Sequence, residues 1–531
     1  MDPVVVIGAG PVGLTAALLL TRWDLPVVVL ERRAARDPAG SRSICQQRDV
    51  LDIWAAVGAG AVAEEGLTWT TARTFYRDRE LFSWSFTGRG ASPLPPFVNL
   101  SQARTEEILS ARAAADARID VRWGHEVTGL SQDGDGVTLH CANGAVIRAS
   151  HVVACAGARG GGVVRGALGV GFEGRAFGDE FLICDIRADL PGWENERRFY
   201  FDPEWNPGRQ VLIHPCPDST FRIDWQVPPG FDLAAEEAGG GLDRRIRQII
   251  GPVPYELVWR SVYRFQSRIA DRMREGRVLL AGDCAHLVAP FGARGLNSGV
   301  PDAENAAWKI AFVVRGWASE RLLATYHDER HAAAAENLAV TDATMRFLVP
   351  QSAAEWRVRR ATLEKAALDP ATAMASVDSG RFAEPYWYSD SPLTTPEPSR
   401  PFAGRPPKGE DAVPGPGVIV PDAVMKAGRR FRELVRDGFT VLLAGRDDHG
   451  SFERAARTAT EAPVTVLGLD RIDALAPALG ADPGEAWLIR PDAHIAAVLP
   501  GATPERLETA VRRALGYGSV SDMVEPRGAA P

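Results

Sequence analysis

The sequence predicts an α/β protein with several domains, and three observations lead to this prediction. A β-branched strand at the very start runs into a glycine-rich turn and a helical stretch. Between residues 176 and 269, several segments alternate polar and apolar residues with a period of two, which is typical of half-buried strands. After a proline-rich stretch, short apolar runs alternate with helical segments. With 531 residues, the chain exceeds the size of one hydrophobic core, so about two or three domains are expected.

The first element of this arrangement is a strand that leads into three glycines. Residues Val4–Ile7 form a short β-branched run, as in a buried parallel strand. The motif after it consists of Gly8, Gly10, Pro11, Val12 and Gly13. Glycines at this spacing allow a tight turn, close approach of the backbone to a pyrophosphate, and close packing of a helix on the strand.

A helix, a second strand and an acidic residue complete a dinucleotide-binding pattern. Residues 14–23 read as the helix, whose N-terminal N–H groups and dipole favour phosphate charge. Residues 27–30 give the second strand, and Glu31 closes it, where a carboxylate accepts hydrogen bonds from ribose hydroxyls. This order predicts a Rossmann-type nucleotide site. The alternative is a glycine turn that binds nothing.

Composition argues against several classes of partner. The net charge is −8, from 60 basic and 68 acidic residues, without a long basic run, so nucleic acid and anionic membranes are poor partners. No apolar span reaches the about 18 residues of a membrane helix. The first strand begins at once, which leaves no room for a signal peptide. The six cysteines show no metal-ligand spacing, so we expect free thiols in a reducing cytoplasm and no metal site.

A second signal lies around Asp283. Residues 277–286 contain a buried strand that ends in an acid, Asp283, after Gly282; residues 290–299 are glycine-rich, and residues 302–311 read as a helix. An acid at a strand end can bind ribityl hydroxyls, and a glycine loop lets backbone N–H groups approach the edge of a flavin ring. A helix beginning there would stabilise negative charge on the reduced ring. Together with the N-terminal motif, this predicts an enzyme that holds FAD between a dinucleotide-binding domain and a substrate domain.

These residues resemble the group A FAD-dependent aromatic hydroxylases of the para-hydroxybenzoate hydroxylase class, in particular the phenol and 3-(3-hydroxyphenyl)propionate hydroxylase branch. Residues 282–311 match the GD motif of that family nearly throughout, and the likeness covers most of residues 1–350. The resemblance implies that NADPH or NADH reduces FAD, that O2 forms a flavin C4a-hydroperoxide, and that a phenolic or polyketide-like aromatic substrate is hydroxylated. Two alternatives stay open: a Baeyer–Villiger or epoxidising oxygenase on an aromatic polyketide, and a protein that binds flavin and an aromatic ligand but is reduced poorly.

The resemblance also implies which residues hold the cofactor. Asp283 is expected at the ribityl chain, Arg42 near the pyrophosphate, and Gln102 at the ribityl chain or the flavin edge. A plainer role is a solvated arginine for Arg42 and a polar helix-start residue for Gln102. Pro290 lies in the loop expected beside the flavin, where the backbone shapes the oxygen pocket, and it is counted with the catalytic residues as well. The predicted set is Gly8, Gly10, Pro11, Val12, Gly13, Glu31, Arg32, Arg42, Gln102, Arg159, Asp283, Pro290, Gly295, Leu296 and Asn297.

One stretch departs from the family pattern. The family carries an Asp-Gly-Ala-Arg-Ser motif that is linked to flavin and NAD(P)H binding, whereas here Ala156 replaces the aspartate and the serine is missing. We expect a glycine-rich turn about two residues longer than usual, with Arg159 retained. The fold should therefore hold, and Arg159, Arg165 and backbone amides are favoured to support reduction; an impaired reduction step is the alternative.

The middle of the chain predicts the substrate-binding sheet. Its candidate strands are residues 181–186, 197–201, 210–215, 221–227 and 257–265. Polar residues on these strands that could face a pocket are His214, Arg222, Asp224, Gln226 and Tyr263. We assign His214 and Tyr263 to phenol deprotonation, since a base with a pKa near neutrality serves best, and the other three to substrate binding. An ordinary polar role in the sheet is the alternative for each.

A third unit follows a helical stretch at residues 319–348 and a proline-rich stretch that reads as an extended linker. Strands are expected at residues 439–444, 464–469, 486–489 and 494–499, with helices near 451–460, 471–479 and 504–517. This unit resembles the thioredoxin-like tail of phenol hydroxylase relatives. No cysteine follows Cys284, so dithiol chemistry is excluded and packing or a homodimer contact is expected, with His494 as a strand residue. The expected domains are FAD-binding at 1–70, 101–175 and 270–350, substrate-binding at 71–100 and 176–269, linker at 351–415, and thioredoxin-like at 416–531.

Overall fold

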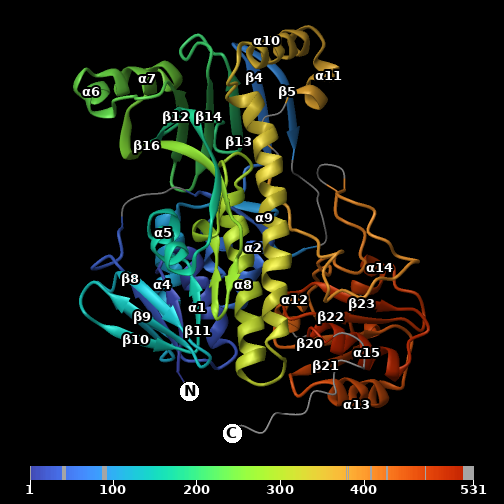
Figure 1. Cartoon of the computed structure of the whole chain (residues 1–531). Coiled ribbons are helices and arrows are strands. Elements are labelled where there is room, and N and C mark those ends of the chain that lie inside the picture. The colour runs from blue at the N-terminus through green and yellow to red at the C-terminus, as the bar shows by residue number, and fades with distance from the viewer. Residues whose placement is uncertain are drawn as a thin grey trace.

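The structure is a computed structural model, and it describes residues 2–38, 43–85, 92–377, 380, 382–406, 410–425, 428–472 and 474–517. Figure 1 shows three regions: a large sheet at the top, a region of helices and smaller sheets at the lower left, and a C-terminal unit at the lower right. The long helix α9 (Arg321–Leu348) runs from the lower regions up to the large sheet. None of the helices in these ranges is long and apolar enough to cross a membrane.

A six-stranded sheet carries the N-terminal glycine motif. Its strands in spatial order are β17 (Arg274–Glu275), β18 (Val278–Leu280), β11 (His151–Ala154), β1 (Val4–Ile7), β2 (Val27–Glu31) and β7 (Ile119–Trp123). All neighbours are parallel except β17 and β18. Residues Val4, Val5 and Val6 are buried, as in a parallel sheet covered on both faces. Helices α1 (Pro11–Thr21), α4 (Gln102–Ala114) and α8 (Arg294–Val314) share one hydrophobic core with this sheet, and so do Val137 and Leu139 of a smaller antiparallel sheet. The predicted Rossmann-type arrangement is confirmed.

Smaller elements complete this region. They are the two-stranded sheet of β3 (Cys45–Gln47) and β6 (Phe97–Asn99), the three-stranded sheet of β8 (Val127–Gln132), β9 (Val137–Cys141) and β10 (Val146–Ala149), and the helices α2 (Arg48–Ala56), α3 (Ala61–Glu65) and α5 (Gly157–Leu168).

Two expectations about local structure were wrong here. The helix expected at 302–311 begins at Arg294, so Gly295 lies in its first turn rather than in a loop. Ala293, in the left-handed region at φ 56°, turns the chain, and its carbonyl accepts a hydrogen bond from Asn297 Nδ2 at 2.5 Å. The expected glycine-rich turn after Ala156 is instead helix α5. A side chain at Gly161 would lie 3.1 Å from Cys284, so glycine at this position lets the helix pack closely on residues 282–284. Close packing there outweighs the low helix propensity of glycine.

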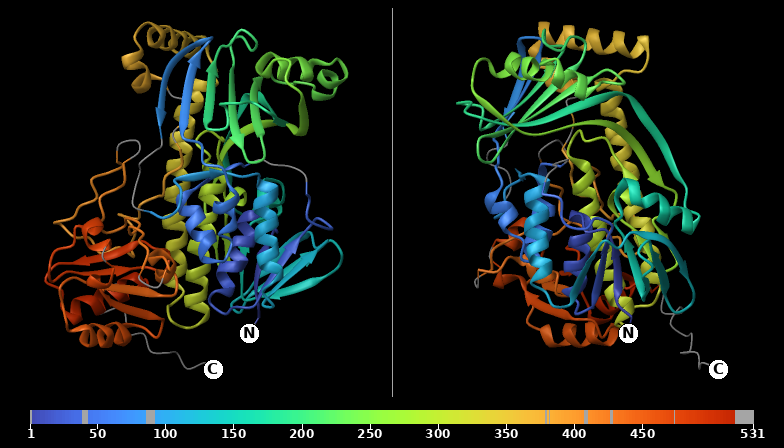
Figure 2. Two further views of the ribbon diagram at one scale, coloured as in Figure 1. Left: turned by 180° about the vertical axis from the view of Figure 1, so that it is seen from behind. Right: turned by 90° about the vertical axis from the view of Figure 1, so that its left-hand side faces the viewer.

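An eight-stranded sheet forms the second region and contains all five predicted strands. Its spatial order is β19 (His286–Leu287), β16 (Tyr255–Ala270), β12 (Phe172–Ala188), β15 (Thr220–Val227), β14 (Gln210–Cys216), β13 (Glu196–Phe201), β4 (Thr71–Tyr76) and β5 (Arg79–Ser85). Helix α7 (Gly241–Ile250), after α6 (Leu233–Ala238), packs on one face of this sheet. Helices α10 (Ala353–Leu368) and α11 (Pro370–Ser376) lie at the β4–β5 end. Figure 2 shows β12 and β16 curving down toward the first region, where β19 follows the Gly282–Asp283 turn.

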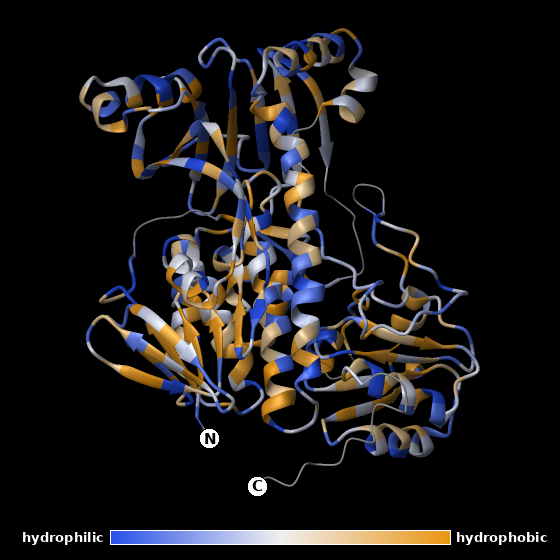
Figure 3. Ribbon diagram, in the orientation of Figure 1, coloured by the Kyte–Doolittle hydropathy of each residue, from blue (hydrophilic) through white to orange (hydrophobic). Residues whose placement is uncertain are grey.

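The C-terminal unit is a four-stranded sheet with helices. Its strands in spatial order are β21 (Val464–Gly468), β20 (Phe439–Leu443), β22 (Ala486–Ile489) and β23 (Ile495–Leu499), and its helices are α12 (Phe431–Val435), α13 (His449–Ala459), α14 (Leu475–Leu479) and α15 (Pro504–Ala514). Only β20 and β21 are parallel, which fits the expected thioredoxin-like arrangement. Figure 3 shows that its strands are largely hydrophobic. The proline-rich stretch is not a free linker, because Trp387, Tyr388 and Leu393 are buried.

Candidate functional site

One continuous cavity of about 760 Å³ joins the carboxyl ends of the six-stranded sheet to one face of the eight-stranded sheet. This volume lies within the range of roughly 300–1,000 Å³ that is usual for ligand sites. Residues from β1, β2, α4, α5 and α8 line one end, and residues from β12 to β16 line the other. The two ends therefore form a single space, in which a nucleotide cofactor and a second ligand could lie in contact.

The glycine motif shapes the nucleotide end of the cavity. Gly8 has φ +108°, and a side chain on it would lie 2.4 Å from the Cys155 carbonyl oxygen. A side chain on Gly13 would lie 1.9 Å from the carbonyl oxygen of Gly8, so α1 can approach β1 only because this residue is glycine. A side chain on Gly10 would meet nothing within 4 Å, since Gly10 borders the open cavity at the start of α1. This is the free space that a pyrophosphate needs at a helix N-terminus.

Glu31 lies at the end of β2 beside this cradle. Its carboxylate accepts hydrogen bonds from Ala9 N at 2.9 Å and from Arg33 N at 3.1 Å. Burial alone would raise the pKa of Glu31, but these N–H groups and the Arg33 guanidinium outweigh it, so the pKa lies below its usual value. Glu31 and the predicted Arg32 both line the cavity, as does Arg33, which sequence reasoning missed. An ionised carboxylate here can bind ribose hydroxyls.

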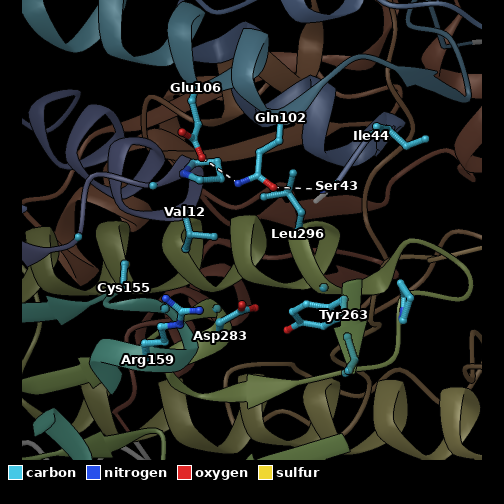
Figure 4. A pocket seen from close by; sticks show the side chains of 18 of the residues that line it. Val12, Ser43, Ile44, Gln102, Glu106, Cys155, Arg159, Tyr263, Asp283 and Leu296 are labelled. Carbon is cyan, nitrogen blue, oxygen red and sulfur yellow. Dashed lines mark hydrogen bonds between the residues drawn. The ribbon is translucent and has the colours of Figure 1, made fainter. Parts of the chain in front are cut away.

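The turn of η1 (Gly282–Cys284) brings Asp283 to the cavity, where Arg159 of α5 also lies. Figure 4 shows these two side chains reaching toward the cavity from the same side. Arg165 is not part of the lining. Its Nη1 donates to the Cys284 carbonyl at 2.7 Å and so fixes α5 against the turn. Ala156 lines the cavity with no side chain that caps α5.

Gln102 reaches into the cavity from the opposite side in Figure 4, at the start of α4. Its Oε1 accepts from Ser43 N at 3.1 Å and its Nε2 donates to Glu106 at 2.8 Å. These bonds hold its amide at the cavity edge, where Val12 and Leu296 also lie. Arg42 lies outside the described residues.

The start of α8 and the loop before it form the wall between the two ends of the cavity. Pro290, Gly295 and Leu296 line this wall. Asn297 does not line the cavity. Its side chain accepts from Gln47 N at 2.8 Å and donates to the Cys45 carbonyl at 2.9 Å, so it ties β3 to α8.

Four of the five predicted residues of the substrate sheet share the cavity face: His214, Arg222, Asp224 and Tyr263. Strand pairing explains this, since residues two apart point to the same side and Arg222 pairs with His214 in register. Gln226 is not in the lining. It is fully buried, donates to Asp179 at 2.6 Å and accepts at 3.2 Å from the N–H of Gln210, which does line the cavity.

The sheet end of the cavity is lined by charged and polar side chains, and burial shifts the pKa values of His214 and Asp224. Arg222 forms a two-pronged ion pair with Asp185, with distances of 2.7 and 2.8 Å. Burial, followed by the charges of Arg197 and Arg222, lowers the pKa of His214 well below its usual value. Burial raises the pKa of Asp224 to about 7. Within the described part of the chain, His214 Nδ1 and Asp224 Oδ1 are buried atoms without a hydrogen-bond partner.

Several lining residues were missed by sequence reasoning. Arg197 of β13 lines the cavity and is nearly fully buried, and burial lowers its pKa to about 10. Phe181 and Phe265 were missed as well, and they pack against Phe291, which follows Pro290 in the loop before α8, with ring centroids 4.3–6.1 Å apart. The two-residue period of the strands could have indicated Arg197, Phe181 and Phe265, but it does not show which face is covered by α7.

Known proteins match this arrangement over nearly the whole chain. Residues 1–341 match the FAD binding domain family, and residues 413–517 match the C-terminal region of aromatic-ring hydroxylases. The 6-methylpretetramide 4-monooxygenase of Streptomyces rimosus is 32% identical over 93% of this chain and 90% of its own. A flavin-dependent monooxygenase of Mycobacteroides abscessus is 35% identical over 65% of this chain and 75% of its own.

Solved structures agree in fold. The flavin-dependent monooxygenase PieE, in complex with FAD and substrate, superposes with a TM-score of 0.82 at 24% identity and covers 97% of this chain and 99% of its own. The glycine cradle, the ionised Glu31 and the Asp283 turn fit the pyrophosphate, ribose and ribityl parts of FAD. The chain therefore belongs to the FAD-dependent aromatic-ring hydroxylases, which are flavoprotein monooxygenases.

Proposed function

We propose that this enzyme uses FAD, NADPH or NADH, and O2 to place one oxygen atom on a phenolic, polyketide-like aromatic substrate. The observation that carries the proposal is the continuous cavity, which joins the dinucleotide cradle to a polar row on the substrate sheet. Bound FAD would supply the hydride and oxygen chemistry, and the protein supplies binding, orientation and electrostatics.

The shape of the cavity supports an aromatic substrate. The ring walls Phe181, Phe265 and Phe291 give an apolar surface beside the α8 wall, where an aromatic ring can pack and exclude water. Several relatives are named 3-(3-hydroxy-phenyl)propionate hydroxylases, but they match only 62–69% of this chain, whereas a 6-methylpretetramide 4-monooxygenase matches 93% of it and an aklavinone-11 hydroxylase structure matches 97%. We infer a substrate of the latter, fused-ring kind rather than a simple phenol.

The polar row supports a substrate with acidic hydroxyl groups. His214 is held neutral by burial and by two nearby guanidinium groups, so it is a weaker base than the role predicted for it requires, and its Nδ1 can instead form a hydrogen bond with a substrate hydroxyl. The positive charges of Arg197 and Arg222 would favour ionisation of that hydroxyl and stabilise its phenolate. Tyr263 lines the same space and can donate to, or accept from, a second ring oxygen.

The reductive step is assigned to NADPH or NADH at the α5 side of the cavity. Arg159 provides a cationic contact for a phosphate there, and Ala156 lines the same cavity with only a methyl side chain.

The test is NADPH and NADH oxidation by the FAD-loaded enzyme with matched ring pairs, such as a naphthol and its methyl ether, and product detection by mass. We expect the hydroxylated ring to stimulate oxidation and to gain one oxygen, whereas the ether does neither. A ring-expanded ester or lactone product would show Baeyer–Villiger oxygenation instead of hydroxylation and would contradict the proposed reaction. FAD that dithionite reduces but neither nucleotide reduces would contradict the proposal and favour a binding protein.

A further inference from the structure

Buried charges join the C-terminal unit to the helices behind the flavin end of the cavity. Here the C-terminal unit means residues 418–517 as far as they are described. Glu329 of α9 lies at the centre of the contact. It accepts hydrogen bonds from Lys309 Nζ at 2.7 Å and Asn305 Nδ2 at 2.8 Å, both on α8, and from Arg490 of the C-terminal unit at 2.6 and 2.9 Å. Ser391 also donates to it, at 2.6 Å.

The buried charges in this network balance one another. The cations are Lys309, Arg330 and Arg490, the anions are Asp302, Glu329 and Asp492, and none of the six is more than 3% exposed. Such a network is costly to bury, and apolar packing of the same volume often gives equal or greater stability. Its presence therefore indicates a role in fixing positions rather than in stability alone.

One branch of the network ends at the flavin turn. Asp302 Oδ2 accepts from Gly282 N at 3.0 Å and contacts His286 Nε2 at 2.7 Å. Asp302 Oδ1 accepts from Arg330 Nε at 2.7 Å. Gly282 has φ +58° and precedes Asp283, the carboxylate that enters the cavity. The backbone direction of this turn, and with it the aim of Asp283, depends on how Asp302 and Arg330 are held.

Tyr388 holds Arg330 from the other side. Its hydroxyl accepts from Arg330 Nη1 at 2.9 Å. The ring of Tyr388 lies 4.2 Å from the His494 ring and 5.0 Å from the Arg490 guanidinium, and its N–H donates to the Gly417 carbonyl at 2.8 Å. Tyr388 thus links the C-terminal unit to the flavin turn in two steps, through Arg330 and Asp302.

A second contact of the C-terminal unit grips the neighbouring helices. Arg436 Nε donates to Glu304 of α8 at 2.6 Å, and its Nη1 donates to Asp52 of α2 at 2.7 Å. Helix α2 follows β3 directly, and Cys45 of β3 lines the cavity. The same unit therefore holds two elements that border the cofactor space.

We propose that the C-terminal unit is a clamp for the flavin site and that Tyr388 is a positioning residue for the Gly282–Asp283 turn, acting through Arg330 and Asp302. This role goes beyond the reaction proposed above and depends only on FAD binding. It gives a use to a domain that has no cysteine for redox chemistry.

The test is FAD binding by Tyr388→Phe, which removes one hydroxyl and keeps the ring. We expect the Kd for FAD, measured by flavin fluorescence with the apoprotein, to rise roughly ten-fold, as for the loss of one hydrogen bond to a charged group. The visible spectrum and the midpoint potential of the bound flavin should shift as well, because Asp283 is no longer aimed as before. A purely structural role would lower the unfolding midpoint and leave both flavin signatures unchanged.

Ser391→Ala is the matched control, because it removes a hydrogen bond to Glu329 in the same network but off the path to Gly282. It should lower stability to a similar degree and leave the FAD Kd within about two-fold. Equal loss of FAD affinity in both variants, or native affinity and spectrum in Tyr388→Phe, overturns the proposal. Should Tyr388→Phe not fold, Arg330→Lys is measured instead and judged by the same two signatures, since lysine keeps the charge but cannot bridge Asp302 and Tyr388.

Discussion

Two glycines of the N-terminal motif allow a prediction that separates an effect on cofactor binding from an effect on folding. Gly10→Ala adds a methyl group that meets no protein atom within 4 Å, whereas the same change at Gly13 places a methyl 1.9 Å from the Gly8 carbonyl oxygen. Gly10 has φ −77°, which alanine adopts freely. The first change should therefore act on the cofactor and the second on the fold.

The magnitudes follow from this geometry. Alanine at Gly10 gains about 0.4–1 kcal/mol by restricting the unfolded chain and loses a similar amount as a poorer helix N-cap, so apoprotein stability should change by less than about 0.5 kcal/mol. Its methyl group occupies the space through which a pyrophosphate would reach the helix N-terminus. Loss of one charge-assisted hydrogen bond, about 1.5–3 kcal/mol, is roughly ten- to hundred-fold in Kd. Gly13→Ala should cost about 3 kcal/mol of unfolding free energy, because the backbone cannot yield.

The assay is urea unfolding of each apoprotein together with an FAD titration followed by flavin fluorescence. Native FAD affinity in Gly10→Ala would refute the reasoning, since it would mean that the pyrophosphate does not approach this residue. A large stability loss in Gly10→Ala would also refute it, because it would show that the space is not open.

Three further predictions concern the site and the thiols. Burial raises the pKa of Asp224 to about 7, so its contribution to folding stability is fully present below the ordinary pKa of 3.8 and is lost as the pH rises through 7. Asp224→Asn should abolish this loss in unfolding measurements between pH 4 and 8. An unchanged pH profile in that variant would contradict the burial argument. Arg159→Met should weaken NADPH binding roughly ten-fold while Ala156→Asp changes it little, as measured by flavin reduction rates; the reverse order would show that the missing acid matters. Burial raises the pKa of Cys45 to about 12 and of Cys284 to about 11. Ellman's reagent should therefore label at most the partly exposed Cys216 in the native protein, and all six thiols after unfolding. Rapid labelling of two or more thiols in the native protein would contradict the buried positions.

Most residues predicted for the cofactor line one end of the cavity, because the signals that identify them are local. Strand, glycines, helix and acid follow one another within a short stretch, and each has one physical use. The Gly282–Asp283 turn was identified in the same way. The start of α8 was not predicted, because glycines and a proline in residues 294–301 argue against a helix. The hydrogen bonds of Asn297 to Cys45 and Gln47, which hold this first turn, depend on a strand that lies far away in the sequence.

The substrate end was predicted only in part. The period of two placed His214, Arg222 and Asp224 on one face, but where that face leaves the cavity depends on neighbouring strands, so Gln226 could not be excluded. Arg197 was passed over for the same reason, since one strand does not show what its face will meet.

The contact of the C-terminal unit could not be predicted from the sequence. Charged residues are usually exposed, so no local pattern marks Glu329, Arg490 and Lys309 as buried; the packing of three distant segments buries them together. His494, expected as a plain strand residue, lies against Tyr388 just before β23.

The measurement that tests the central claim most directly is turnover under 18O2, with FAD-loaded enzyme, NADPH and a hydroxylated fused-ring aromatic. The account predicts a product that carries one new hydroxyl with a single 18O atom, formed only in the presence of both NADPH and the aromatic. Oxidation of NADPH that yields only hydrogen peroxide with every aromatic, or a product whose new oxygen comes from water, would contradict the claim that one cavity brings flavin, oxygen and ring together.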